Sequence, residues 1–142
     1  MRAGARGARL ACGSASILQR RAYVSVNSYC LGALMVFLTA ARSSIDAAVA
    51  YHGGDTEKYL GEVNGLNGPL LMHLGEEDEF ISKAAQAQIK AALAPKSNAK
   101  IHSYPGQYHA FSRHNGKHYN AAAAALAHQR THEFLNQHLR YT

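Results

Sequence analysis

Residues 22–42 read AYVSVNSYCLGALMVFLTAAR, and this stretch decides the fold. Its first part, residues 22–29, contains tyrosine and valine at spacings that favour a β-strand. Leu31 to Arg42 has almost no polar residue, which is typical of a helix buried on all sides. Between strand and helix stands Cys30, with the small residues Ser28 and Gly32 two positions to either side. This is the pattern of a nucleophile elbow, the sharp turn that lifts a reactive side chain out of the backbone.

The position of Cys30 at the start of a helix has a chemical consequence. Unsatisfied N–H groups at a helix N-terminus favour the thiolate, so we expect a lowered pKa for the Cys30 thiol. On this motif alone, the alternative is an inert cysteine buried at the start of a core helix.

Further strands and helices alternate along the rest of the chain. The apolar runs end in glycine or proline, as strands do before a turn, and Ser82 is a typical helix cap. The predicted strands are residues 45–51, 69–74 and 100–104, the predicted helices are 83–94 and 118–139, and 55–68 reads as a surface loop with at most one helical turn. This alternation predicts an α/β fold, with a mostly parallel sheet of about four strands flanked by helices.

The first strand reads as apolar on both faces, so we expect it to be central in the sheet. Only residues 1–21 precede it, and an uncovered parallel edge is a liability. We therefore expect residues 22–142 to be the C-terminal portion of a larger domain. A homodimer formed through this truncated edge is the alternative.

The charge is concentrated at the N-terminus. Lys and Arg number 15 against nine Asp and Glu, a net charge of +6, and residues 1–21 hold five arginines and no acid. The remainder is nearly neutral, so we predict no nucleic-acid partner. The sequence contains no apolar run of about 18 residues, so we predict no membrane span. We expect residues 1–21 to form a basic, disordered extension. This extension has three interpretations: a mitochondrial targeting segment, a basic arm, or an extension before an incomplete domain. We expect a cytoplasmic protein, and the first interpretation makes a mitochondrial one the alternative.

Two more chemical groups follow predicted strands, at the edge where parallel sheets place their sites. The acidic run 76–79 follows the strand 69–74, and His109 follows the strand 100–104. Cysteine, acid and histidine then have the chain order of an α/β-hydrolase triad, in which the acid orients the imidazole and the imidazole activates the nucleophile. Taken singly, the acidic run is a solvated turn and His109 is a loop histidine.

From about Cys30 to Leu139 the chain resembles the C-terminal half of the dienelactone hydrolases (carboxymethylenebutenolidases). The matching segments, in order, are 29–32, 46–54, 69–81, 104–111 and the alanine-rich last helix with Arg130. The resemblance implies an N-terminally truncated α/β-hydrolase fold. It also implies hydrolysis of a dienelactone-like ester or lactone through a thioester, as in the degradation of aromatic compounds, with no cofactor.

The resemblance also implies roles for particular residues. Cys30 is the expected nucleophile, Asp78 the triad acid and His109 the general base and acid. Arg113 matches an arginine that holds the substrate carboxylate, and the N–H of Leu31 is an expected oxyanion donor. Tyr51, at a strand end on the same edge, is a further candidate for lining the pocket.

Two departures from the family support a second interpretation. Ser28 stands where the family usually has glycine, and the family's N-terminal half, which supplies a second oxyanion donor, has no counterpart. The alternative function is therefore a catalytically inactive fragment that needs a partner chain or a dimer to complete its sheet. Two pairs of histidines are spaced four residues apart, His114 with His118 and His128 with His132. Neither pair has a clear third ligand, so we predict no metal site.

Overall fold

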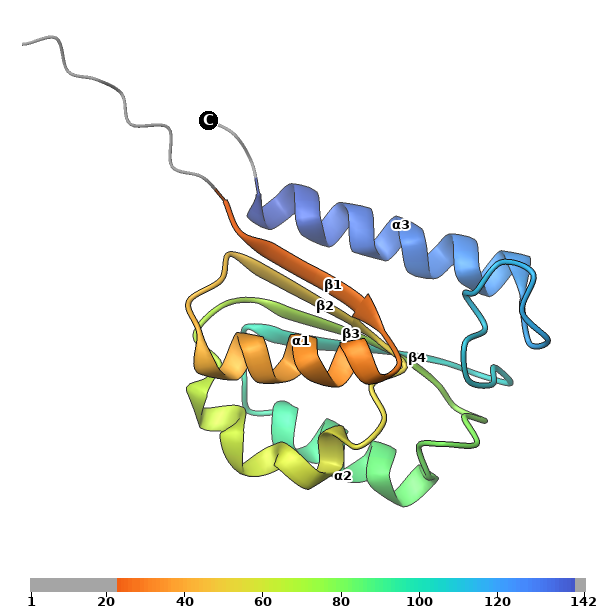
Figure 1. Cartoon of the computed structure of the whole chain (residues 1–142), viewed down its shortest axis with the longest axis horizontal. Coiled ribbons are helices and arrows are strands. Elements are labelled where there is room, and N and C mark those ends of the chain that lie inside the picture. The colour runs from red at the N-terminus through yellow and green to blue at the C-terminus, as the bar shows by residue number, and fades with distance from the viewer. Residues whose placement is uncertain (1–22, 140–142) are drawn as a thin grey trace, which may run out of the picture.

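The computed structural model describes residues 23–139, and the predicted extension, residues 1–21, lies outside them. Four parallel strands form one sheet in the order β1-β2-β3-β4. The strands are β1 (Ser25–Tyr29), β2 (Ala47–Tyr51), β3 (Leu70–Gly75) and β4 (Ala99–Tyr104). Helices α1 (Leu31–Arg42) and α2 (Lys83–Leu93), with the 3₁₀ segment η1 (Thr56–Gly65), cover one face, and α3 (Ala121–His138) covers the other (Figure 1). The predicted fold class is confirmed.

The core has two parts, one on each face of the sheet. Every residue of β2 and β3 is buried, because helices lie on both sides of these strands. The larger cluster joins α1 and α2 to Leu70, Met72 and Leu74 of β3. The smaller cluster lies beneath α3 and includes Val49, Leu71 and Phe111. The two clusters use alternate residues of the same strands, as the pleat of a sheet requires.

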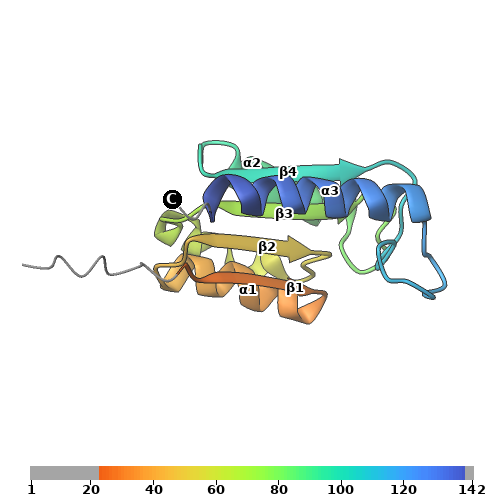
Figure 2. The same cartoon turned by 90° about the horizontal axis from the view of Figure 1, so that it is seen from above.

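The first strand is not central in the described sheet, which corrects the expectation from its sequence. It pairs with β2 alone among residues 23–139, and Ser25, Asn27 and Tyr29 are exposed. Figure 2 shows the reason: α3 runs over the other strands and leaves this face of β1 uncovered. The strand carries polar side chains where a central strand would be apolar, which the sequence reading undervalued.

The segment after β2 also differs from expectation. Instead of a loop with one helical turn, η1 extends over ten residues, broken at Tyr59 by non-helical backbone angles. It packs against α1, where Arg42 forms a bidentate ion pair with Glu62. The Nη2 and Nε atoms of Arg42 donate to the two carboxylate oxygens at 2.6 and 2.7 Å. The predicted cap at Ser82 is present, since its hydroxyl accepts the N–H of Ala85.

The last helix starts slightly later than the sequence suggests. Asn120 caps it by accepting the N–H of Ala123, so α3 begins at Ala121 rather than at residue 118 or 119. None of the helices within residues 23–139 is long and apolar enough to cross a membrane.

Candidate active site

The C-terminal ends of the four strands meet at one edge of the sheet. Each strand is followed there by a residue of chemical interest: Cys30 after β1, His52 after β2, Asp78 after β3 and His109 after β4. Parallel strands bring such residues together however far apart they are in sequence.

The backbone at Cys30 makes a sharp turn between β1 and α1. Its angles are φ 55° and ψ −122°, a region that residues other than glycine rarely adopt. The turn is held from both sides, since the N–H of Cys30 donates to the carbonyl of Tyr51 and its carbonyl accepts the N–H of Ala33, both at 2.9 Å. The predicted elbow is therefore formed, and its strain is supported by the strand and helix on either side.

Cys30, His109 and Asp78 form a continuous hydrogen-bonded chain. The Sγ of Cys30 lies 3.0 Å from Nε2 of His109, and Nδ1 of His109 lies 2.8 Å from Oδ2 of Asp78. The other carboxylate oxygen of Asp78 accepts the N–H groups of Phe80 and Ile81, at 2.9 and 3.1 Å. Both oxygens of this fully buried carboxylate are thus satisfied. The acidic run presents one inward acid, and it is the one that the family resemblance indicates.

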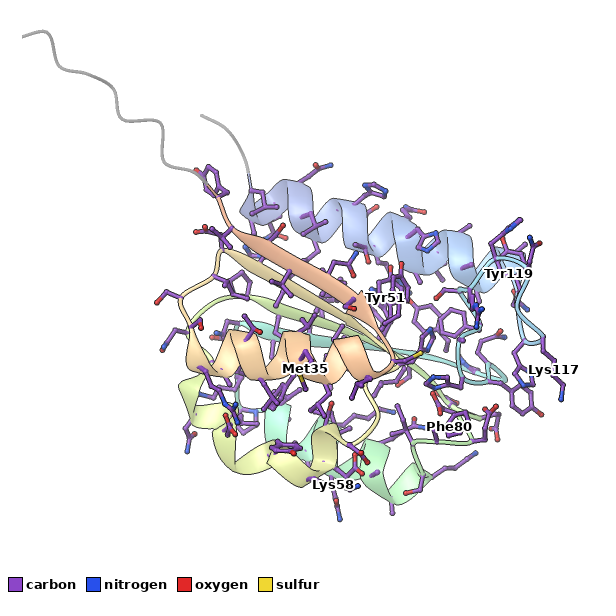
Figure 3. All side chains as sticks on the ribbon, in the orientation of Figure 1. Met35, Tyr51, Lys58, Phe80, Lys117 and Tyr119 are labelled. Atoms are coloured by element: carbon purple, nitrogen blue, oxygen red, sulfur yellow. The ribbon has the colours of Figure 1, made fainter. Side chains whose placement is uncertain are left out.

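The ring of His109 is held between two other rings. Phe80 meets it edge-on at 4.9 Å between centroids, and His52 lies 5.3 Å away on a tilted plane. Figure 3 shows Phe80 beyond the strand ends, on the loop that follows β3. These contacts keep the imidazole in the orientation that serves both Cys30 and Asp78.

His52 is a site residue that the sequence analysis missed. Its side chain is fully buried, and Nε2 lies 3.1 Å from the hydroxyl of Ser112. Burial, reinforced by the neighbouring His109, lowers the pKa of His52 to about 4, so this imidazole is uncharged near neutral pH. The signal was present in the sequence, because His52 directly follows a buried strand, but the residue reads there only as part of a strand-ending turn.

The pKa of Cys30 departs from the sequence expectation. Burial raises the pKa of the Cys30 thiol, the charge of Asp78 raises it further, and Arg113 opposes both. The expected lowering by the helix N-terminus is therefore wrong in its net direction. The Nε2 of His109, at 3.0 Å from this thiol, lies within the reach of a general base.

A pocket of about 300 Å³ opens beside Cys30. It is lined by Tyr29, Cys30, His52, Ala110, Ser112 and Arg113. A tight turn brings Arg113 there, because Ala110 has a φ of 57° and its carbonyl accepts the N–H of Arg113 at 2.9 Å. The structure thus places one cation in the same pocket as the thiol.

The remaining two predicted site residues have different positions. Leu31 is the first residue of α1, where a backbone N–H has no partner within the helix, and the residue is 72% exposed. Tyr51 is not in the pocket, which corrects the sequence interpretation.

Tyr51 points instead toward α3, into the core (Figure 3). Its hydroxyl lies 2.6 Å from the Oγ1 of Thr131, and its ring stacks on Tyr29 at 4.6 Å and on His73 at 4.4 Å. Strand β2 ends at Tyr51, which faces the core. The next residue, His52, has a φ of 56°, so the chain leaves the extended strand conformation there and the side chain of His52 lines the pocket. Within residues 23–139 no three His, Cys, Asp or Glu side chains are grouped to hold a metal ion.

Comparisons with known proteins agree with this architecture. Residues 13–139 match the model of the dienelactone hydrolase family. A carboxymethylenebutenolidase of Pseudomonas putida is 36% identical over 112 residues, which cover 79% of this chain and 48% of that protein. A protein of Azospirillum brasilense, provisionally named carboxymethylenebutenolidase, is 42% identical over 109 residues, covering 77% of this chain and 47% of the relative.

A solved structure shows the same arrangement of strands and helices. It is a protein of Klebsiella pneumoniae, provisionally described as a dienelactone hydrolase, with 27% identity and a TM-score of 0.72 over 80% of this chain and 51% of the other. The chain therefore spans about half the length of the relatives that it matches.

Proposed function

Because the chain belongs to the dienelactone hydrolase family, we propose that it hydrolyses an ester or lactone with Cys30, His109 and Asp78 as its catalytic triad. The observation that carries this proposal is the unbroken chain from Sγ of Cys30 through both ring nitrogens of His109 to Asp78, at 3.0 and 2.8 Å. A nucleophile, a base and an orienting acid at such distances are the parts that acyl transfer needs.

In the first half of the reaction, Cys30 attacks the ester carbonyl carbon while Nε2 of His109 takes the thiol proton. The N–H of Leu31 stabilises the negative charge that develops on the carbonyl oxygen. When the tetrahedral intermediate collapses, the C–O bond of the ester breaks and His109 returns the proton to the leaving alkoxide. A thioester on Cys30 remains. For a lactone, the alcohol stays attached to the acyl group.

In the second half, water attacks the thioester carbon and gives a proton to His109. The C–S bond then breaks, the carboxylic acid leaves, and Cys30 recovers its proton. Asp78 holds the imidazole in the tautomer that has a proton on Nδ1, and it stabilises the imidazolium that forms twice in each cycle. No step requires a metal or a cofactor.

Arg113 gives the proposed site its preference among esters. A guanidinium pairs with a carboxylate through two parallel hydrogen bonds, so a substrate that carries a free carboxylate is favoured. The pocket is of a size for a small molecule, and Tyr29 and Ala110 supply apolar walls. A dienelactone, which combines a small unsaturated lactone with a carboxylate, fits these requirements and would place the protein in aromatic compound degradation.

The test is hydrolysis of cis-dienelactone by the purified chain, followed by absorbance, beside a Cys30→Ala variant. Turnover that disappears in the variant supports the proposal. Equal rates for the two proteins would reject catalysis by Cys30. A Cys30→Ser variant adds a control, because its hydroxyl keeps the hydrogen bond to His109 but is a much poorer nucleophile without stronger activation.

The second candidate function is that of an inactive family fragment that needs a partner or a second copy. It is favoured by the open edge of β1 and by the exposed apolar side chains Val24, Leu31 and Met35 near it. This candidate predicts a dimer by light scattering and no turnover from the monomer. A compartment, cytoplasmic or mitochondrial, is tested by imaging fluorescent fusions with and without residues 1–21.

A further inference from the structure

One carboxylate joins both ends of the loop that carries His109 and Arg113. The Oε2 of Glu79 accepts the backbone N–H of His109 at 3.1 Å, and its Oε1 lies 3.4 Å from Nε2 of His118. We propose that Glu79 is a positioning residue, whose carboxylate bridge between His109 and His118 holds this loop in register with Asp78 and Cys30. The inference rests on the proposed function and adds to it a residue outside the triad.

The loop from His109 to His118 is anchored at Phe111 and Ser112. Phe111 is buried and its carbonyl accepts the N–H of Asn120 at 2.9 Å, and the hydroxyl of Ser112 lies 3.1 Å from Nε2 of His52. Its other backbone bonds are local turns, in which Arg113 donates to Ala110 and Gly116 donates to Arg113, both at 2.9 Å. These contacts join the loop to His52 and to the start of α3, and none of them attaches it to the neighbouring acidic loop. The carboxylate bridge makes that attachment at the ends of the loop.

The bridge and the triad act on the same residue from adjacent positions. Asp78 bonds the ring of His109 at Nδ1, and Glu79 bonds its backbone N–H. Two attachments, one on the ring and one on the backbone, define both the place of the imidazole and its rotation. The nearest other anchors of this backbone are two residues away, at Gln107, whose carbonyl accepts the N–H of Glu77, and at the buried Phe111. Loss of the Glu79 bond would let the backbone of His109 shift between them and move Nε2 relative to the Sγ of Cys30.

The two ends of the loop are also joined by a contact between aromatic rings. The rings of Tyr108 and His118 stack at 4.8 Å with an angle of 21°. His118 is thereby held where its Nε2 faces Glu79. The N–H groups of Glu79 itself and of His109 lower the pKa of the Glu79 carboxyl, so the bridging group stays ionised near neutral pH.

The neighbouring acid provides a matched control. Glu77 lies on the same loop, is exposed and forms its ion pair with Lys83 at 2.9 Å, without a side-chain bond to the loop of His109. Comparing Glu79→Ala with Glu77→Ala therefore separates the carboxylate bridge from a general loss of negative charge. Glu79→Gln is the conservative variant, because its amide oxygen still accepts the N–H of His109.

The experiment measures the rate at which iodoacetamide alkylates Cys30 across a range of pH. The Cys30 peptide is followed by mass spectrometry, so that the second cysteine of the chain, Cys12, does not interfere. Hydrogen exchange at the amide of His109 is measured in parallel by NMR. Neither measurement requires a substrate. The full chain is used as wild type and as the Glu79→Ala, Glu79→Gln, Glu77→Ala and His109→Ala variants.

We expect Glu79→Ala to slow alkylation near pH 7 by about two- to fivefold, the range of an exposed charged contact. Its pH profile should move toward that of His109→Ala, and the His109 amide should exchange faster. Glu79→Gln should restore most of the rate, and Glu77→Ala should match the wild type. An unchanged profile and unchanged exchange in Glu79→Ala would overturn the inference. If His109→Ala alkylates like the wild type while Glu79→Ala still speeds amide exchange, the bridge is supported and the triad is rejected.

Discussion

A Cβ atom on residue 32 would overlap the side chain of Ser28. Strand β1 and helix α1 therefore approach each other at this pair as closely as glycine permits. This approach is what allows the chain to turn sharply at Cys30 and to present its thiol to His109. The pair Ser28 and Gly32 thus links local backbone geometry to the candidate active site.

Substituting Gly32 should therefore be costly, and the cost should depend on Ser28. We expect Gly32→Ala to lower the free energy of unfolding by about 1–3 kcal/mol, because the new methyl group has no room. The double variant Ser28→Gly with Gly32→Ala should recover much of this loss, since it removes the overlapping side chain. Urea denaturation of the single and double variants measures both effects.

Gly61 offers the matched control for this prediction. An added Cβ there meets no other atom within 4 Å. Gly61→Ala should accordingly leave the unfolding midpoint near that of the wild type. Equal losses at residues 32 and 61 would show that helix–strand contact is not what restricts Gly32.

Asp78→Asn should lower the pKa of Cys30 and at the same time reduce the rate of hydrolysis. Since the Asp78 charge raises the pKa of Cys30, its removal should shift the alkylation profile of Cys30 to lower pH. Hydrolysis should nevertheless fall by about 10²–10⁴-fold, because the imidazole loses the group that sets its tautomer. The amide oxygen of asparagine can still accept the N–H groups of Phe80 and Ile81, so the loop should keep its shape. A Cys30 pKa that rises in this variant would contradict the electrostatic account.

Tyr51→Phe tests the placement of Tyr51 in the core. Removing the hydroxyl leaves Thr131 without its 2.6 Å partner and should cost about 1 kcal/mol of stability. Cys30 alkylation and the KM for substrate should not change, because Tyr51 does not line the pocket. The exposed Tyr59 is the control, and Tyr59→Phe should alter neither property. A changed KM with unchanged stability would place Tyr51 at the site after all.

The stability of the protein should fall steadily as the pH is lowered below about 6.5. Burial, with the positive charge of Arg130 and nearby histidines, lowers the pKa of His73 to about 3, and His52 has a pKa of about 4. The unfolded chain takes up protons at these residues from about pH 6.5, whereas the folded chain does so only near pH 3–4. Acid therefore favours unfolding, by a total for His73 on the order of 3–5 kcal/mol.

This dependence should be visible in urea denaturation between pH 7 and pH 4. His73→Gln should flatten it, leaving the part contributed by His52, although it also loses the bonds to Tyr104 and Thr131 at 2.8 and 3.0 Å. His132→Gln, at an exposed position of α3, should retain the full slope. A variant of His73 with the slope of the wild type would rule out His73 as a source of the dependence.

Much of the fold followed from patterns confined to short stretches of chain. The apolar runs of β2 and β3, the cap at Ser82 and the cysteine between two small residues are recognisable without any distant contact. Sequence patterns gave wrong predictions where the position of an element depends on contacts with segments distant along the chain. The cover of β1 shows this, because the course of α3 decides that the face with Ser25 and Asn27 is exposed, although the polarity of these two residues was a signal in the sequence.

The sequence by itself determined the alternation of strands and helices, the turn at Cys30 and the order of cysteine, acid and histidine. These features depend on residue size, polarity and backbone preference over a few positions, which can be read along the chain. Only the tertiary structure decided that Tyr51 faces the core, that His52 enters the site and that Glu79 holds the backbone of His109. Such choices depend on contacts between residues 30 to 80 positions apart, and those contacts exist only once the sheet has brought its strand ends together.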